Sequence, residues 1–253
     1  VSMWDEEVRE HQTEKMSFKL FMKIRFYFTP KIETLDIDDS VMFFTQTVYD
    51  IIMDRIPVTE EQLLQLAALH LLVDWGRYSD STVTKFMEKI DEYIPRKMLA
   101  NHSPDDWVEL IKPHAKRFGD MDKIKARSEY LNICKQFPLF LAQQYPARYE
   151  KRGEDEVEFN YPEKVIIAVT PEHLVIADGD TREVVKAVKL HNIITWGVSN
   201  EFFVPVVGDR HEQEKLYFAT TQAKNINLLL QTYTALKLGE GIPPTTAKKG
   251  KDA

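Results

Sequence analysis

The seven histidines are the side chains of this sequence best suited to metal binding or proton transfer. They stand at positions 11, 70, 102, 114, 173, 191 and 211, with no HExxH pattern and no ligand spacing to a cysteine or carboxylate. His70 falls at helical spacing beside Leu66 and Val73, which is typical of a histidine in a core or at a domain boundary. The sequence therefore predicts no metal and no cofactor.

Signatures of nucleotide binding and of serine hydrolysis are missing from the sequence. None of the nine glycines forms GxGxxG or GxxxxGK, and no GxSxG occurs. Asp36, Asp38 and Asp39 resemble the start of a calcium loop, but Val41 stands where that loop needs glycine. We expect these aspartates to cap a helix. A non-catalytic protein is favoured, and an enzyme without a familiar motif is the weaker alternative.

Three basic residues alternate with apolar ones in the segment 18–28, FKLFMKIRFYF. This period of two is typical of extended chain with one buried side. Lys19, Lys23 and Arg25 would lie on the other side, where they could hold an acidic lipid headgroup or an acidic peptide. Charge on the wet face of a half-buried strand is also the ordinary outcome, so both interpretations stay open.

Composition limits the remaining classes of function. The chain has 33 Lys plus Arg against 40 Asp plus Glu, a net charge of −7, which argues against a general nucleic-acid binder. Its most apolar run, 63–73, is too short to cross a bilayer and is interrupted by Gln65 and His70. The acidic start is unlike a secretory signal, and one cysteine, Cys134, makes no disulfide framework. We expect a cytosolic chain and, since it opens on Val1, a piece of a longer protein.

Helical spacing of apolar residues occupies 38–138. One predicted helix opens at Thr59, whose pairing with Gln62 forms a capping box. Another begins at Ser103, with Pro104 in its first position. Further helices are predicted near 41–52, over 81–94, and from 119 to just before Pro138.

Short apolar runs separated by turns follow Pro138, and they predict a small β-barrel. Seven strands are expected, at 139–149, 164–169, 173–178, 184–189, 193–198, 201–207 and 214–220. A helix over 222–238 carries a single apolar stripe and would close one end of the barrel. The charged segment 150–163 and the Pro-, Gly- and Lys-rich tail after 239 are expected to lie outside the packed cores.

This order of elements resembles a FERM domain. The strings FKLFMKIRFYF, EEQLLQLAALHLLVDWG and NICKQFPLFLAQQY resemble the strand that opens its helical lobe, the second helix of that lobe and the passage into its barrel. SPDDW at 103–107 and the turn Phe137-Pro138-x-Phe140 are most similar to FERM units of class VII-type unconventional myosin tails, and talin is a more distant match. Leu141 departs from the family, which usually has glycine there.

The resemblance implies an α+β fold, an acyl-CoA-binding-protein-like helical bundle followed by a seven-stranded PH/PTB-like barrel with a C-terminal helix. It implies the end of a ubiquitin-like first lobe at 1–15, a helical central lobe at 16–138, a PH-like lobe at 139–239 and a disordered tail at 240–253. It also implies a non-catalytic cytoskeletal module at the actin cortex or in filopodia. Such a module binds cargo adaptors or receptor tails and contributes to motor regulation. A talin-like adhesion linker and a phosphoinositide-binding module are the alternatives.

The same resemblance implies a peptide-binding groove between the fifth strand, 193–198, and the C-terminal helix, where an extended peptide adds to an open strand edge. Alternation places Ile194, Trp196 and Val198 on one side of this strand. On the helix, four residues are expected to line the groove: Asn227, Leu230, Gln231 and Thr234. Trp196 and Leu230 could instead be core residues.

Overall fold

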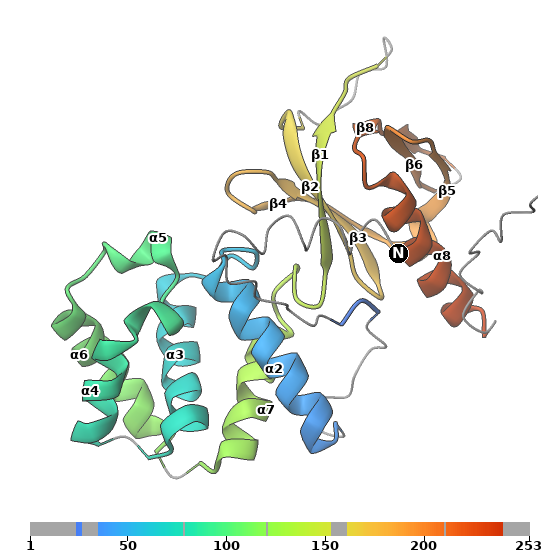
Figure 1. Cartoon of the computed structure of the whole chain (residues 1–253). Coiled ribbons are helices and arrows are strands. Elements are labelled where there is room, and N and C mark those ends of the chain that lie inside the picture. Colours follow the sequence, from blue (N-terminus) through green and yellow to red (C-terminus); the bar gives the residue numbers. More distant parts are fainter. Residues whose placement is uncertain are drawn as a thin grey trace, which may run out of the picture.

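A helical lobe (residues 37–134) and a sheet lobe (residues 143–237) lie side by side in the computed structural model, as Figure 1 shows. The structure describes residues 24–26, 35–77, 79–119, 121–152, 161–209 and 211–239. No helix within these ranges has the length and apolarity needed to span a membrane. The helical lobe contains α2 (Ile37–Ile52), α3 (Glu60–Trp75), α4 (Asp80–Glu88), η2 (Ile90–Glu92), α5 (Arg96–Leu99), α6 (Pro104–Arg117) and α7 (Lys123–Cys134).

The helix starts follow the capping chemistry of the sequence. Asp36 accepts a hydrogen bond from the backbone N–H of Asp39 at 2.7 Å, which confirms a cap in place of a calcium loop. Thr59 and Gln62 bond reciprocally at 3.3 and 2.9 Å, so the predicted capping box is confirmed. Ser103 likewise caps α6.

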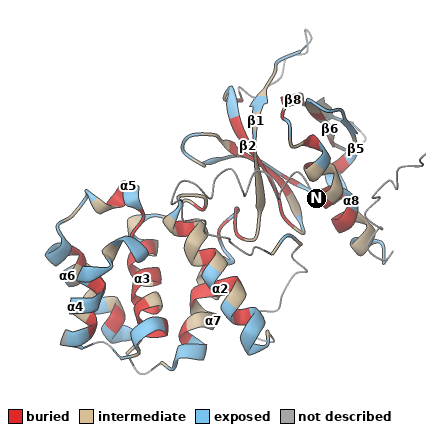
Figure 2. Ribbon diagram, in the orientation of Figure 1, coloured by how far each residue is buried: buried red, intermediate tan, exposed pale blue. Residues whose placement is uncertain are grey.

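Helix α3 forms the centre of the helical lobe. Its sequence predicts one apolar stripe, yet residues on nearly every side of it are buried, because α4, α6 and α7 pack around it (Figure 2). A helix that is apolar all round is stable only when neighbours cover it on several sides. Its buried residues are Leu63, Leu64, Leu66, Ala67, Ala68, Leu69, Leu71, Leu72 and Val73.

The sheet lobe is a curled antiparallel sheet followed by one helix. Its described strands run in the spatial order β4-β3-β2-β1-β8-β6-β5, and β7 pairs with β6. The strands are β1 (Gln143–Tyr149), β2 (Lys164–Val169), β3 (His173–Asp178), β4 (Val184–Lys189), β5 (Ile193–Val198), β6 (Phe202–Gly208), β7 (Gln213–Lys215) and β8 (Phe218–Ala219), and η3 (Leu190–Asn192) precedes β5. Helix α8 (Ala223–Lys237) buries its apolar stripe against the concave side.

Strands β2 and β3 connect the two lobes because both of their faces are buried. Val165, Ile167 and Val169 belong to the apolar cluster of the sheet lobe, whereas Ile166 and Ala168 belong to that of the helical lobe. Neighbouring residues on a strand point to opposite faces, so β2 contributes to two cores. Burial on both faces is why residues 164–169 read as one continuous apolar run.

Two predicted strands differ clearly from the observed ones, and β6 begins and ends one residue after the predicted 201–207. The strand predicted at 139–149 begins only at Gln143, since Leu141 has a φ of 56° and turns the chain. A left-handed φ suits glycine, which accounts for the glycine expected at this position. The strand predicted at 214–220 is divided into β7 and β8. The predicted helix over 81–94 gives way at Lys89 to the 3₁₀ turn η2, and α5 was not predicted.

Candidate peptide-binding edge of the sheet

The two terminal strands of the described sheet, β4 and β5, differ in charge. Exposed strand edges in monomeric proteins are commonly protected by charged residues, lysine above all. Strand β4 has this protection in Lys186 and Lys189, whereas β5 contains no charged residue. Lys186 also forms an ion pair with Glu214 of β7. Of the two terminal strands, β5 is therefore the one whose edge lacks the protection of lysine.

The register between β5 and β6 shows which backbone groups of β5 face outward. Pro205 of β6 pairs with Trp196, but the Pro205 carbonyl accepts a hydrogen bond from the N–H of Leu216, at 3.0 Å. The backbone carbonyl of Pro205 thus points toward β7, away from β5. Trp196 and Pro205 therefore form a non-hydrogen-bonded pair. Since the pattern alternates, the N–H and C=O groups of Trp196 and Val198 point away from β6 toward the free edge. No described strand occupies that edge.

The side chains of this edge present an apolar surface with Trp196 at its centre. Ile194 is 47% exposed and Val198 is 38% exposed, both high values for aliphatic residues on a strand. Trp196 is half-buried, and its indole Nε1 donates a hydrogen bond to Oδ1 of Asn227 on α8, at 2.8 Å. This bond joins β5 to α8, which Figure 1 shows beside the strand.

The predicted helix residues occupy different environments. Asn227 and Thr234 are partly exposed and Gln231 is exposed, so these three can form the rim of the edge. Leu230 is fully buried in the core of the sheet lobe, which is the alternative that the sequence left open for it. We use the name β5 edge for Ile194, Trp196 and Val198 together with the rim residues Asn227, Gln231 and Thr234.

Of the three basic residues predicted to bind an acidic group, the structure describes Arg25, and Lys19 and Lys23 lie outside the described residues. Arg25 donates from Nη2 to Oδ1 of Asn225 at 2.9 Å. It borders a cavity of about 310 Å³, which is lined by Ile24, Arg25, Gln143, Tyr145 and Asn225. Arg25 and Asn225 alone are 200 positions apart, so no local pattern in the sequence predicted the cavity.

The residue before Arg25 is held between the lobes by its backbone. The N–H of Ile24 donates to Oε1 of Gln46 on α2 at 2.9 Å, and its carbonyl accepts from Nε2 of Gln143 on β1 at 2.8 Å. In the same cavity, burial raises the pKa of Tyr145 to about 12, so its hydroxyl stays protonated and can donate a hydrogen bond.

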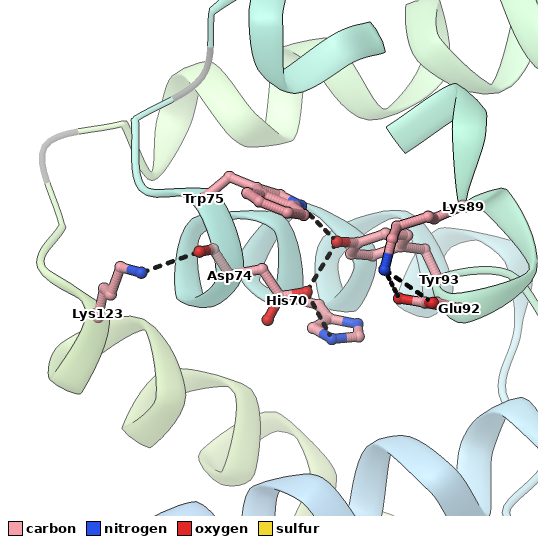
Figure 3. A network of polar contacts seen from close by, with 7 residues as sticks. All are labelled: His70, Asp74, Trp75, Lys89, Glu92, Tyr93 and Lys123. Carbon is pink, nitrogen blue, oxygen red and sulfur yellow. Dashed lines mark hydrogen bonds and ion pairs between the residues drawn. The ribbon is translucent and has the colours of Figure 1, made fainter. Parts of the chain in front are cut away.

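A second polar constellation lies at the C-terminal end of α3 and includes His70 (Figure 3). The hydroxyl of Tyr93 donates to Oδ2 of Asp74 at 2.8 Å and accepts from Nε1 of Trp75 at 2.8 Å. Nε2 of His70 lies 3.3 Å from the same Asp74 oxygen. Lys123 of α7 donates to the Asp74 carbonyl at 2.9 Å. We call the residues His70, Asp74, Trp75 and Tyr93 the α3 corner.

The electrostatics of the α3 corner favour a structural role. Burial lowers the pKa of His70, although Asp74 and Glu92 act in the opposite direction, so the ring is neutral at pH 7. Its ring also packs 5.5 Å from Phe44 and 4.5 Å from Tyr93, between centroids. His70 is thus partly buried among aromatic rings, which agrees with the prediction of a histidine in the core or at a domain boundary. Among the described residues, no group of three or more His, Cys, Asp or Glu could hold a metal ion.

Comparison with known families divides the chain into two matched regions. Residues 36–145 match the FERM central domain, and residues 149–238 match the PTB domain (IRS-1 type). Talin-A of Dictyostelium discoideum is 23% identical over 214 residues, which are 85% of this chain and 16% of talin-A. Unconventional myosin heavy chain 6 of Caenorhabditis elegans is 22% identical over 235 residues, 89% of this chain and 11% of that myosin.

A solved structure has the same fold. The C-terminal MyTH4-FERM domain of human myosin 7b, determined in complex with the harmonin-a PDZ3 domain, superposes with a TM-score of 0.69 at 14% identity. The superposition covers 92% of this chain and 46% of that one. The chain spans less than half the length of the curated relatives that it matches.

Proposed function

We propose that this chain, which carries the helical and PTB-like lobes of a FERM domain, is a non-catalytic module of a cytoskeletal protein that recruits extended peptides at the β5 edge. The parent protein is an unconventional myosin whose tail carries cargo adaptors or the tails of membrane receptors. The module acts at the actin cortex or in filopodia and contributes to regulation of the motor. A talin-like adhesion linker is the second candidate, since talin-A and the myosin are matched at nearly equal identity.

The observation that carries this proposal is the free backbone of Trp196 and Val198. A peptide strand that pairs there satisfies N–H and C=O groups that water otherwise solvates, so each hydrogen bond contributes only about 0.5–1.5 kcal/mol. Affinity and selectivity must then come from side chains. Exposed Ile194 and Val198 offer apolar contacts on either side of Trp196, which is half-buried.

A proline at position 198 tests strand addition directly. Val198→Pro removes one outward N–H while leaving the bonds to β6, and proline is tolerated on a strand edge where its nitrogen faces solvent. The matched control Val198→Ala keeps the N–H and shortens the side chain. The probe is the peptide Thr-Leu-Thr-Leu-Thr-Leu-Thr, titrated by calorimetry or fluorescence anisotropy.

We expect Val198→Pro to weaken binding by about ten- to a hundredfold, because the peptide carbonyl that faces it loses its donor. Val198→Ala should weaken binding by about three- to tenfold, because only apolar contact is lost. Thermal melts recorded alongside establish that both variants are folded. If folded Val198→Pro binds the peptide as wild type does, the β5 edge is not the site.

The cavity beside Arg25 supports a minor alternative, an acidic lipid headgroup as partner. Its test is binding to vesicles that contain phosphoinositide, with Arg25→Gln as the variant. Loss of vesicle binding in Arg25→Gln, with peptide binding unchanged, would establish the cavity as a lipid site separate from the β5 edge.

A further inference from the structure

The segment that contains β4 and β5 and the segment that contains α8 have a charge opposite to that of the chain. The segments 184–198 and 223–237 contain no aspartate or glutamate, although the chain has 40 such residues and a net charge of −7. They contain four lysines: Lys186, Lys189, Lys224 and Lys237. Because Lys186 is paired with Glu214, three lysines contribute net positive charge beside the edge.

The three remaining lysines are exposed near both ends of the β5 edge. Lys224 lies three residues before Asn227, hence on the same stripe of α8, and Lys237 ends that helix. Lys189 precedes β5 by one short turn and is followed by exposed His191. Lys189, Lys224 and Lys237 are exposed, and none of them forms an ion pair with a described residue.

We infer that the β5 edge selects peptides whose apolar alternating core is flanked by acidic residues. This inference rests on the proposed function, because it names the chemistry of the partner at the same site. Ile194 and Val198 receive the apolar positions, and the flanking carboxylates meet Lys189, Lys224 and Lys237. Exposed Glu201 lies in the turn after β5.

The inferred selectivity is electrostatic and acts over short range. Exposed ion pairs are individually weak, but several of one sign at the rim of a site steer association and discriminate against ligands of that sign. The preference should therefore fade as salt shortens the screening length. An effect of apolar contact alone would not change with salt in this way.

The experiment compares three peptides with one core, Leu-Thr-Leu-Thr-Leu, flanked on both sides by two glutamates, two glutamines or two lysines. We expect the glutamate peptide to bind about tenfold more tightly than the glutamine peptide and the lysine peptide to bind most weakly, at low ionic strength. The difference should shrink to about twofold near 0.5 M salt.

A pair of matched variants assigns the preference to the edge. Lys224→Glu changes a lysine in the first turn of α8, and Lys125→Glu changes one in the first turn of α7, in the other lobe. The helix dipole favours a carboxylate at both places. Lys125→Glu also removes an exposed ion pair with Asp122 at 3.6 Å, which contributes little to stability, so both variants should fold. We expect Lys224→Glu to lower the affinity for the glutamate peptide by about three- to tenfold. Lys125→Glu should change this affinity by less than about twofold.

The outcomes separate this inference from the proposed function. Equal affinity for all three peptides, or tighter binding of the lysine peptide, overturns the acidic preference and leaves strand addition standing. Equal losses in the two variants also overturn it, since the effect would then come from net charge. Absence of binding by every peptide overturns the proposed function itself.

Discussion

The α3 corner and the β5 edge differ in how their polar groups are hydrogen-bonded. At the α3 corner, Tyr93 satisfies Asp74 and Trp75 at once, and His70 contacts the same carboxylate. At the β5 edge, backbone groups and aliphatic side chains face solvent without a partner from the described chain. A site that satisfies its own groups contributes to stability, whereas a site that leaves them open is suited to bind another molecule.

The largest expected effect lies in the core beneath the β5 edge. Leu230→Ala should lower the free energy of unfolding by about 2–5 kcal/mol, since Leu230 is fully buried and its truncation leaves a cavity. The neighbouring Gln231→Ala, at an exposed position, should change it by less than about 0.5 kcal/mol. Denaturant unfolding measures both. Similar values for the two variants would contradict the division between core and rim.

At the α3 corner, Tyr93→Phe removes a single oxygen that makes two hydrogen bonds. The indole N–H of Trp75 and the carboxylate of Asp74 each lose a partner, so the free energy of unfolding should fall by about 1–3 kcal/mol. Tyr217→Phe is the control, because the Tyr217 hydroxyl makes no hydrogen bond with a described residue. Urea unfolding of the two variants gives the comparison, and an equal loss would refute a special role for the α3 corner.

His70 should make the stability of the helical lobe depend on pH. Its pKa in the folded protein is below the ordinary value of 6.5, so the unfolded chain binds the proton more readily. Stability should therefore fall as pH drops from about 7.5 to 5.5, and it should be regained as pH rises. Melting temperatures of wild type and His70→Gln across this range provide the test. The slope should be smaller in the variant, and identical slopes would exclude His70 as the cause.

The smallest effect on stability is expected at the rim of the β5 edge. Thr234→Glu places charge and bulk on a partly exposed position, so the free energy of unfolding should change by less than about 0.5 kcal/mol. Binding of the uncharged peptide Thr-Leu-Thr-Leu-Thr-Leu-Thr should nevertheless weaken, because the longer side chain obstructs the β5 edge. If Thr234→Glu has the melting temperature and peptide affinity of wild type, Thr234 is not part of the rim.

Local chemistry made much of the fold predictable from the sequence. The capping box of Thr59 and Gln62 needs only four residues, and its reciprocal bonds are found as expected. Strands β2, β3, β4 and β5 have the predicted bounds, because their apolar runs end at turn residues. Alternation along β5 predicts Ile194, Trp196 and Val198 on one side, but the register with β6 shifts between Ile193 and Thr195, so strict alternation does not extend to Ile194.

Features that depend on tertiary context could not be predicted. The bond from Trp196 to Asn227 joins residues 31 positions apart, and the contact of Arg25 with Asn225 spans 200. The sequence contains one indication of the α3 corner, the i,i+4 spacing of His70 and Asp74. Tyr93 lies outside helix α3, so its contact with Asp74 could not be predicted. Leu141 adopts a left-handed φ that its residue type disfavours, so local preference pointed to a longer strand.

Amide hydrogen exchange along β5, measured residue by residue by NMR, tests strand addition at the β5 edge most directly. In the free protein, Thr195 and Gly197 should be protected through their pairing with β6, whereas Trp196 and Val198 should exchange quickly. Saturating peptide should slow the amide exchange of Trp196 and Val198. The exchange of Thr195 and Gly197 should stay nearly unchanged. Peptide binding without any slowing at Trp196 and Val198 would contradict the account.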